Sequence, residues 1–365
     1  MLINKLLRSA ITFLFLFYVS VCFAKQVSNL DYSYTEVQDR SSLTRKEALQ
    51  ACFQNVILKN SGTNEALNNE VIQKHIADPR SFLIKYGYEQ NNGRLVLTCR
   101  FNLLRIHRLL QENNLPIWGS QRPLTTLWLT IESGSSTSVV STSNHHYIRG
   151  EVNTFSKMRG LDFDFPEKQA MSEEKVSVID LKEGFVQNIA VASLDHKSDF
   201  FAVANLTELG NFWTYELTLY SRQSLKSGDH DFVLRRHGQA ATKSEVVQEL
   251  IENINLYYVD RYATTEQGRN TRVFLEFNKI SNPKMIMKIK KFFKKQSIIA
   301  SSRIVKMTSS RAIFLLEIQG SESELDRILK LERNIIREKG FSEFQYAYEN
   351  DGIERRDVPV YRWKN

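Results

Sequence analysis

The residues of this chain that could act as nucleophiles, acids or bases are few and scattered. His145 and His146 follow a Ser- and Gly-rich run, "SGSSTSVVSTSN", which could supply a serine nucleophile beside a histidine base. No G-x-S-x-G elbow is present, and such runs between elements are typical of loops. Asp162 and Asp164 alternate with phenylalanines, as acids do on the exposed face of a strand. We therefore expect a protein without catalytic activity and keep a hydrolase as the third hypothesis.

Metal and nucleotide chemistry lack their usual sequence motifs. The seven histidines form no H-E-x-x-H pattern, and the cysteines do not have the spacing of zinc ligands. Neither G-x-x-x-x-G-K-[ST] nor G-x-G-x-x-G occurs. We expect no metal and no other cofactor.

Cys52 and Cys99 are candidates for a disulfide bond. Cys52 lies in "EALQACFQNVIL", which has helical periodicity, and Cys99 lies in "RLVLTCRF", which alternates like a strand. A helix packed on a strand could bring the thiols together, and the bond would stabilise the fold by about 4 kcal/mol in the chain-entropy model. Two buried, unpaired thiols are an equal alternative.

The stretch "LPIWGSQRPLTTLWLTIES" (115–133) is unusually rich in residues with special roles. It contains Trp118, Gly119, Arg122, Pro123 and Trp128. One interpretation is an inter-domain brace, in which proline stiffens the link, tryptophan fills a gap and arginine binds carbonyls. The other is a recognition loop, because Trp and Arg are enriched at interface hot spots. We favour the brace, because residue type alone does not identify a hot spot.

A second binding candidate is the segment "NPKMIMKIKKFFKKQ", which predicts an amphipathic helix. Its apolar residues fall on one face and its lysines fall on the other. The lysines expected to point outward are Lys284, Lys288, Lys291 and Lys295. The apolar face is expected to pack on a sheet, which leaves the lysines either simply solvated or in contact with an anionic surface.

Residues 1–24 are typical of a secretory signal peptide. Lys5 and Arg8 precede an apolar run, and Ala24 ends a "CFA" cleavage site. An uncleaved anchor is the alternative, although the run is shorter than a membrane span. Lipidation at Cys22 is the weaker alternative, because Val21 stands where a small residue is expected.

The positive charge of the chain is concentrated near its C-terminus. The formal net charge is +8, and residues 272–346 alone hold 16 Lys and Arg against 8 Asp and Glu. For an exported protein, an anionic membrane or an acidic partner suits this charge better than nucleic acid does.

The periodicity divides the mature chain into an N-terminal α+β domain (25–116), a second α+β domain (117–263), a basic domain (271–349) and a tail (350–365). In the basic domain we expect strand, helix, strand, strand, helix, strand, with the second helix over 321–340 and the last strand over 344–350. That β-α-β-β-α-β order predicts a ferredoxin-like module. The expected fold class is multidomain α+β.

Three segments resemble an uncharacterised bacterial envelope family, domain of unknown function 2066, over about residues 32–263. They are "TRKEALQACFQNVILKNSG", with Arg45, Ala48, Leu49, Ser61 and Gly62, then "LPIWGSQRPLTTLW", and then "MRGLDFDFP", with Arg159, Gly160 and Pro166. The resemblance implies the periplasm of a Gram-negative bacterium and implies no catalytic residues.

Taken together, these features predict an exported, non-enzymatic cell-envelope protein that binds or scaffolds other envelope proteins. The alternative is a peripheral membrane-surface protein that uses the Lys-rich helix.

Overall fold

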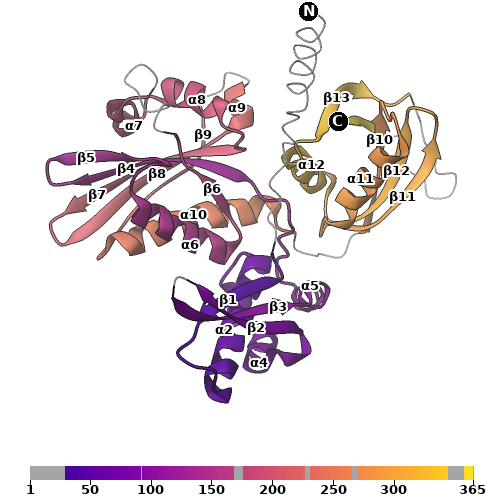
Figure 1. Cartoon of the computed structure of the whole chain (residues 1–365). Helices are drawn as coiled ribbons and strands as arrows, with labels where there is room; N and C mark the ends of the chain where they lie inside the picture. The colour runs from indigo at the N-terminus through magenta and orange to yellow at the C-terminus, as the bar shows by residue number, and fades with distance from the viewer. Residues whose placement is uncertain are drawn as a thin grey trace, which may run out of the picture.

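The structure, a computed structural model, describes residues 29–91, 93–167, 176–226, 231–264, 270–343 and 357–364. It is a mixed α+β fold with three separate sheets, one in each of three units that follow one another along the chain (Figure 1). The predicted signal peptide lies outside the described residues. No helix in the described ranges is long and apolar enough to cross a membrane.

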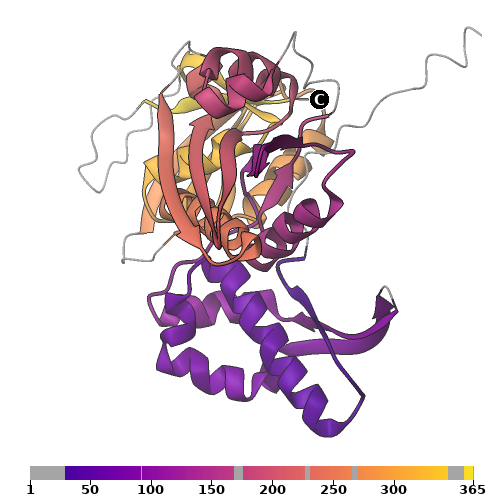
Figure 2. The ribbon, with the colours of Figure 1, turned by 90° about the vertical axis from the view of Figure 1, so that its left-hand side faces the viewer.

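The N-terminal unit is a three-stranded antiparallel sheet, in the order β1-β3-β2, packed against helices. Its elements are β1 (Tyr32–Glu36), α2 (Ser42–Ser61), α3 (Glu65–Asn68), α4 (Glu70–Ala77), the 3-10 helix η2 (Pro79–Ser81), β2 (Leu83–Asn91), β3 (Arg94–Phe101) and α5 (Leu103–Glu112). Ser41 caps the start of α2, and Gly62 ends it in the left-handed conformation. In Figure 2 this unit forms a separate lobe, and its long helix rises toward the other two units.

The middle unit is a mixed sheet in the order β5-β4-β7-β8-β9, with β6 paired to β4. Its elements are β4 (Leu124–Ser133), β5 (Ser136–Val140), α6 (His146–Arg159), β6 (Asp162–Asp164), α7 (Val178–Glu183), α8 (Val186–Asp195), β7 (Phe200–Leu209), β8 (Phe212–Ser221), α9 (Arg222–Lys226), β9 (Phe232–Ala240) and α10 (Lys243–Tyr262). Helices α6 and α10 cover one face, and α7 and α8 cover the other (Figure 1).

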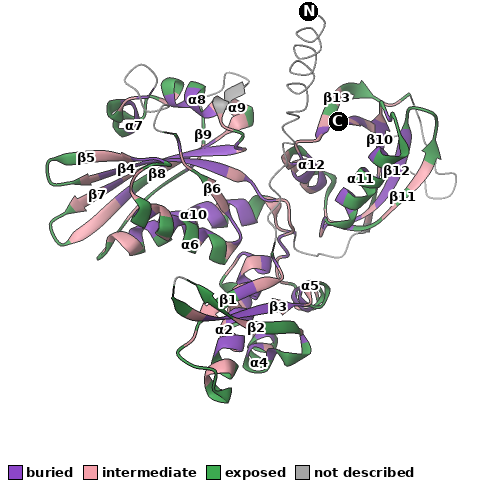
Figure 3. Ribbon diagram, in the orientation of Figure 1, coloured by how far each residue is buried: buried purple, intermediate pink, exposed green. Residues whose placement is uncertain are grey.

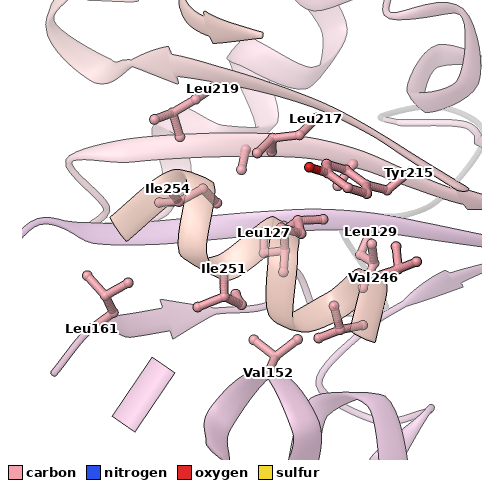
Figure 4. Packing of buried hydrophobic residues seen from close by; sticks show 14 of the residues in the cluster. Leu127, Leu129, Val152, Leu161, Tyr215, Leu217, Leu219, Val246, Ile251 and Ile254 are labelled. Carbon is pink, nitrogen blue, oxygen red and sulfur yellow. The ribbon is translucent and has the colours of Figure 1, made fainter. Parts of the chain in front are cut away.

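Helix cover on both faces explains why β4 is buried almost throughout. Leu127 and Leu129 point into the α6–α10 layer, where they meet Val152, Ile251 and Ile254 (Figure 4). Two sequence predictions need correction here. The "SGSSTS" run is not only a loop, because it contributes to the β4–β5 hairpin. The segment "KEGFVQNIAVASL" (182–194) predicts a single helix, but Gly184 ends α7 within it and α8 begins at Val186.

The C-terminal unit is a five-stranded sheet in the order β11-β12-β10-β14-β13. Its elements are β10 (Asn270–Asn278), α11 (Pro283–Lys294), β11 (Ile299–Met307), β12 (Ala312–Gln319), α12 (Glu322–Leu331), β13 (Ile335–Phe341) and β14 (Pro359–Trp363). Both helices share one core with the sheet. That core includes Phe277, Phe293 and Phe314 in mutual edge-to-face contact.

The end of the chain differs from the sequence prediction. The helix expected over 321–340 ends at Leu331, and β13 follows it, because Ile335 packs into the sheet core and Asn334 turns the chain through hydrogen bonds to Glu332 Oε1. The strand expected over 344–350 lies outside the described residues. The predicted tail contains β14, which enters the sheet parallel to β10 and antiparallel to β13.

Candidate functional site

Residues 115–123 lie where the three units meet (Figure 1). The Ile117 amide donates to the Thr264 carbonyl at 2.8 Å, and the Thr264 amide donates back at 2.9 Å. This bridge joins the link that precedes the middle unit to the link that follows it. The segment 115–123 therefore connects to both ends of the middle unit. Its side chains also contact the N-terminal and C-terminal units.

Arg122 is buried at this junction and binds backbone carbonyls from two helix ends. Its Nη1 donates to the Arg159 carbonyl of α6 at 2.8 Å, and its Nη2 donates to the Lys59 carbonyl of α2. It also donates to the carbonyls of Trp118 and Gly119 within its own segment. The last carbonyls of a helix lack partners inside the helix and carry partial negative charge, so a guanidinium suits them. Arg122 thereby ties α2 to α6.

Trp118 fills the space where α2 meets α10. Its side chain has no exposed surface, and the Arg122 guanidinium stacks on its ring at 3.9 Å. The Trp118 amide donates to the Asn60 carbonyl at 2.7 Å. Gly62 lies beside the ring with a φ of +76°, and a Cβ there would come within 2.3 Å of Val259 in α10. Only glycine fits this close approach without strain.

Helix α10 adds further links between the N-terminal and middle units. Asn255 donates to the Gly62 carbonyl at 2.8 Å. Within the middle unit, Glu252 forms a largely shielded ion pair with Arg159 at 2.7 Å, and Arg159 in turn donates to Asn64 of the N-terminal unit at 2.9 Å. The fixed partners of Arg122 therefore belong to a wider network that spans α2, α6 and α10.

The same segment also contacts the C-terminal unit. Gln121 donates to the Glu332 carboxylate at 2.9 Å, and Ser120 donates to the Lys295 carbonyl at 3.4 Å. Gly119 lies so close to Ser297 that an added Cβ would be 2.9 Å from its hydroxyl. Trp118 and Arg122 thus contact the first two units, while the residues between them contact the third.

Burial of cations sets the electrostatics of the junction. Desolvation lowers the pKa of Arg122 to about 9, so the side chain is still charged at neutral pH. Desolvation, with repulsion from Arg122, lowers the pKa of Lys59 to about 8. The same two causes lower the pKa of His107 to about 4. His107 Nε2 lies 2.9 Å from Asn60 Oδ1, which accepts its hydrogen, and the imidazole is neutral at pH 7.

We expect the protein to lose stability as the pH falls from about 6.5 toward 4, because His107 is neutral in the folded chain. The unfolded chain, with an ordinary histidine pKa of 6.5, binds more protons than the folded chain in this window. The free energy of unfolding then falls by up to about 1.4 kcal/mol per pH unit. Urea titrations across the window measure the slope. The variant His107→Gln keeps a donor for Asn60 but does not titrate, so it should flatten the slope of the unfolding free energy against pH. An unchanged slope would assign the pH dependence to other groups.

The five residues predicted as a brace or recognition loop do not all lie together. Trp118, Gly119, Arg122 and Pro123 belong to the junction, and the burial of Trp118 and Arg122 favours a brace over a recognition loop. Trp128 instead lies in the middle unit, in the core under α7 and α8, where its Nε1 donates to Ser193 at 2.8 Å. Sequence reasoning missed Lys59 and Asn60, because their contacts to the junction go through backbone carbonyls and carry no side-chain signal.

The Lys-rich helix, α11, has the two faces that its sequence predicts (Figure 3). Its apolar residues are buried against the sheet, namely Met285, Ile286, Ile289, Phe292 and Phe293. Lys284, Lys288, Lys291 and Lys295 are exposed, and in the described part of the chain Lys288 and Lys291 form no ion pair. Met287 is 69% exposed among these lysines. The exposed face of α11 is thus cationic with one apolar side chain.

The other chemical candidates are not assembled into a site. His145 is the residue before α6, and His146 Nδ1 contacts Arg149. Asp164 lies 3.7 Å from His196 at the surface. No group of His, Cys, Asp and Glu side chains that could hold a metal occurs within the described ranges. Cys52 and Cys99 are both buried in the N-terminal core as free thiols.

Comparisons with known proteins bear on the N-terminal unit. The family described as Domain of unknown function (DUF8605) matches residues 24–119. This corrects the resemblance inferred from the sequence, because the matching family is not domain of unknown function 2066, and the match ends at Gly119. A comparison with curated proteins gives no match.

Among solved structures, the chain is similar to the LpoB C-terminal domain from Salmonella enterica. The identity is 9%, and the alignment covers 37% of this chain and 91% of that one. The TM-score is 0.22, which is too low for the likeness to support a conclusion about fold or function.

Proposed function

We propose that this protein is an exported, non-enzymatic component of the cell envelope that binds or scaffolds other envelope proteins. The observation that carries the proposal is the junction at residues 115–123, where one partly buried segment bonds to all three units. The N-terminal and middle units cannot turn relative to each other without breaking the Arg122 contacts to α2 and α6, and the C-terminal unit is joined to the same segment through Ser120 and Gln121. Surfaces on different units therefore keep a fixed spacing, which a scaffold needs.

The proposed location is the periplasm of a Gram-negative bacterium, reached through a signal peptide cleaved after Ala24. The basic start, the apolar run and the small residue at 24 support it, and the family match begins at that residue. For the C-terminal unit we propose a ferredoxin-like core in which β14 is inserted between β10 and β13. The neighbouring order of β10, β12 and β11 supports this, as does the single core that the sheet shares with α11 and α12.

In-cell photo-crosslinking tests the scaffolding proposal. A photoreactive residue is placed at Leu43, Val191 or Met287, which are exposed positions on the three units. We expect discrete products with envelope proteins from at least two of these positions. The same residue at position 118 should give only intramolecular products, because Trp118 has no exposed surface. If an exported, folded protein gives only intramolecular products at all four positions, the scaffolding proposal is wrong.

The second candidate function is binding to an anionic membrane surface through α11. The observation that favours it is the cationic exposed face of this helix, on which Met287 could enter the lipid interface between the lysines. This function is compatible with the fold, because the apolar face of α11 stays packed in the sheet core while the lysines face outward.

A further inference from the structure

The N-terminal core brings the only two cysteines of the described chain into contact. Cys52 lies on the buried stripe of α2 and Cys99 lies on β3, and the side chains are 0% and 1% exposed. Cys52 Sγ lies 3.9 Å from the Leu97 carbonyl, on the same strand as Cys99. Both side chains belong to one hydrophobic cluster, and the neighbouring Cys52 thiol, together with burial, holds the pKa of Cys99 far above its ordinary value.

Three features make this pair more than two buried thiols. The residues come from different elements, 47 positions apart, so their contact results from tertiary packing of α2 on β3. Each side chain faces the same core, since Leu97, Cys99 and Phe101 share one face of β3. The neighbours are apolar and closely packed, including Phe53 and Phe101, whose tilted rings have centroids 5.2 Å apart. The packing of α2 on β3 therefore fixes the positions of both sulfur atoms.

We propose that Cys52 and Cys99 are a modification site that is converted to a disulfide bond as the N-terminal unit folds. The bond would fix α2 to β3 and close the loop formed by residues 52–99. Cys52 lies two and a half turns before the end of α2, where Lys59 and Asn60 meet Trp118 and Arg122. A covalent link in the middle of α2 would therefore also support the helix end that the junction uses.

The reaction needs an oxidant that carries a disulfide, either a thiol–disulfide oxidoreductase or a small disulfide such as oxidised glutathione. The thiolate of one cysteine attacks the oxidant's disulfide, and the resulting mixed disulfide is attacked by the other cysteine. Two protons and two electrons leave the cysteine pair, and the oxidant leaves as two thiols. The folded chain shields both sulfur atoms and keeps Cys99 protonated, so the exchange takes place before α2 closes over β3.

The inference rests on the proposed export only for its source of oxidant. Two experiments therefore test separately whether the cysteines can form the bond and whether the protein meets an oxidant in the cell. In the first, residues 25–365 are refolded in a buffer of oxidised and reduced glutathione, and the product is denatured, alkylated and mapped by mass spectrometry. We expect one intramolecular Cys52–Cys99 bond, and in the chain-entropy model an unfolding equilibrium constant roughly 1,000-fold lower than that of the reduced protein. The reduced wild type is the matched control, because its side chains are the same.

Two alkylated cysteines in a correctly refolded chain would overturn the proposal, and so would a bonded form less stable than the reduced form. The double variant C52A/C99A, refolded in parallel, should be insensitive to the glutathione ratio. In the second experiment, protein isolated from cells is alkylated under denaturing conditions without reductant. Blocked cysteines in the cell support both proposals. Free thiols in the cell, together with a bond after refolding, would contradict export while leaving the disulfide site in place.

Discussion

The substitution Arg122→Met is expected to lower the free energy of unfolding by about 3 kcal/mol or more, because it leaves several buried carbonyls without a donor. Methionine retains much of the length of arginine but cannot donate to the carbonyls of Lys59, Arg159, Trp118 and Gly119. An unsatisfied buried carbonyl costs roughly 1 to 3 kcal/mol. Urea unfolding of the mature protein, followed by far-UV circular dichroism, measures the loss.

Two further variants show whether this loss belongs to the junction. Arg94→Met removes an arginine that pairs with Glu36 at an exposed site, and it should cost less than about 1 kcal/mol. Arg122→Lys keeps the charge but not the planar set of donors. It should lower the free energy of unfolding by an amount between those of Arg94→Met and Arg122→Met. If Arg122→Met is no more destabilising than Arg94→Met, the carbonyl network does not hold the units together.

Breaking the junction should also change how the units unfold. In the wild type, α2, α6 and α10 share contacts around Arg122 and Gly62, so the N-terminal and middle units are expected to unfold together. The Arg122→Met variant should separate this transition into two. That separation distinguishes a brace from an arginine that only stabilises its own loop, because a local effect would lower one midpoint without splitting the curve.

The sequence predicted the elements of this fold better than it predicted their connections. The helical spacing of Leu49, Cys52, Phe53 and Val56 identified α2, and the spacing of Met285, Ile289 and Phe293 identified α11, because burial of one helix face leaves a periodic pattern. The unusual residue types also marked 115–123 as a special segment. The sequence could not show which carbonyls Arg122 binds, since every residue has one.

The C-terminal unit shows where periodicity misleads. The run "LERNIIREKG" continues a charged, helix-like pattern, yet Ile335 belongs to a strand, because the chain turns at Asn334. Tyr361 and Trp363 alternate with Val360 and Arg362, and this short strand signal was assigned to a tail. Both errors concern a sheet edge that forms only through the long-range pairing of β13 with β14 and of β14 with β10.

The family assignment failed for a different physical reason. The segment "LPIWGSQRPLTTLW", which crosses the expected domain boundary at 116–117, was one of three segments that indicated the family, and the match that is found ends at Gly119. In the structure, the demand for these residue types comes from packing: a ring that fills the gap between α2 and α10, and a cation for two helix ends. The same packing can favour these residue types wherever helix ends meet at a link. The residue types therefore indicate the local geometry and do not identify a family.

Reversing three lysines on α11 is expected to reduce binding to anionic membranes more than a hundredfold. Lys288, Lys291 and Lys295 lie on the exposed face, and each lysine that contacts an anionic surface contributes about 1 kcal/mol. The triple variant K288E/K291E/K295E turns three attractions into three repulsions. Co-sedimentation with vesicles that contain phosphatidylserine or only neutral lipid, at low and at physiological salt, measures the affinity.

The matched control places the same change of charge on another unit. Lys46, Lys74 and Lys85 are exposed in the N-terminal unit, so K46E/K74E/K85E alters the net charge equally without touching α11. If α11 is the membrane-binding surface, this control should keep most of its affinity, and wild-type binding should weaken as salt rises, because salt screens surface charges. Equal losses in the two triple variants would assign the binding to overall charge. Binding by the wild type that is absent, or that does not respond to salt, would remove the membrane-surface function and leave the braced three-unit scaffold as the proposed role.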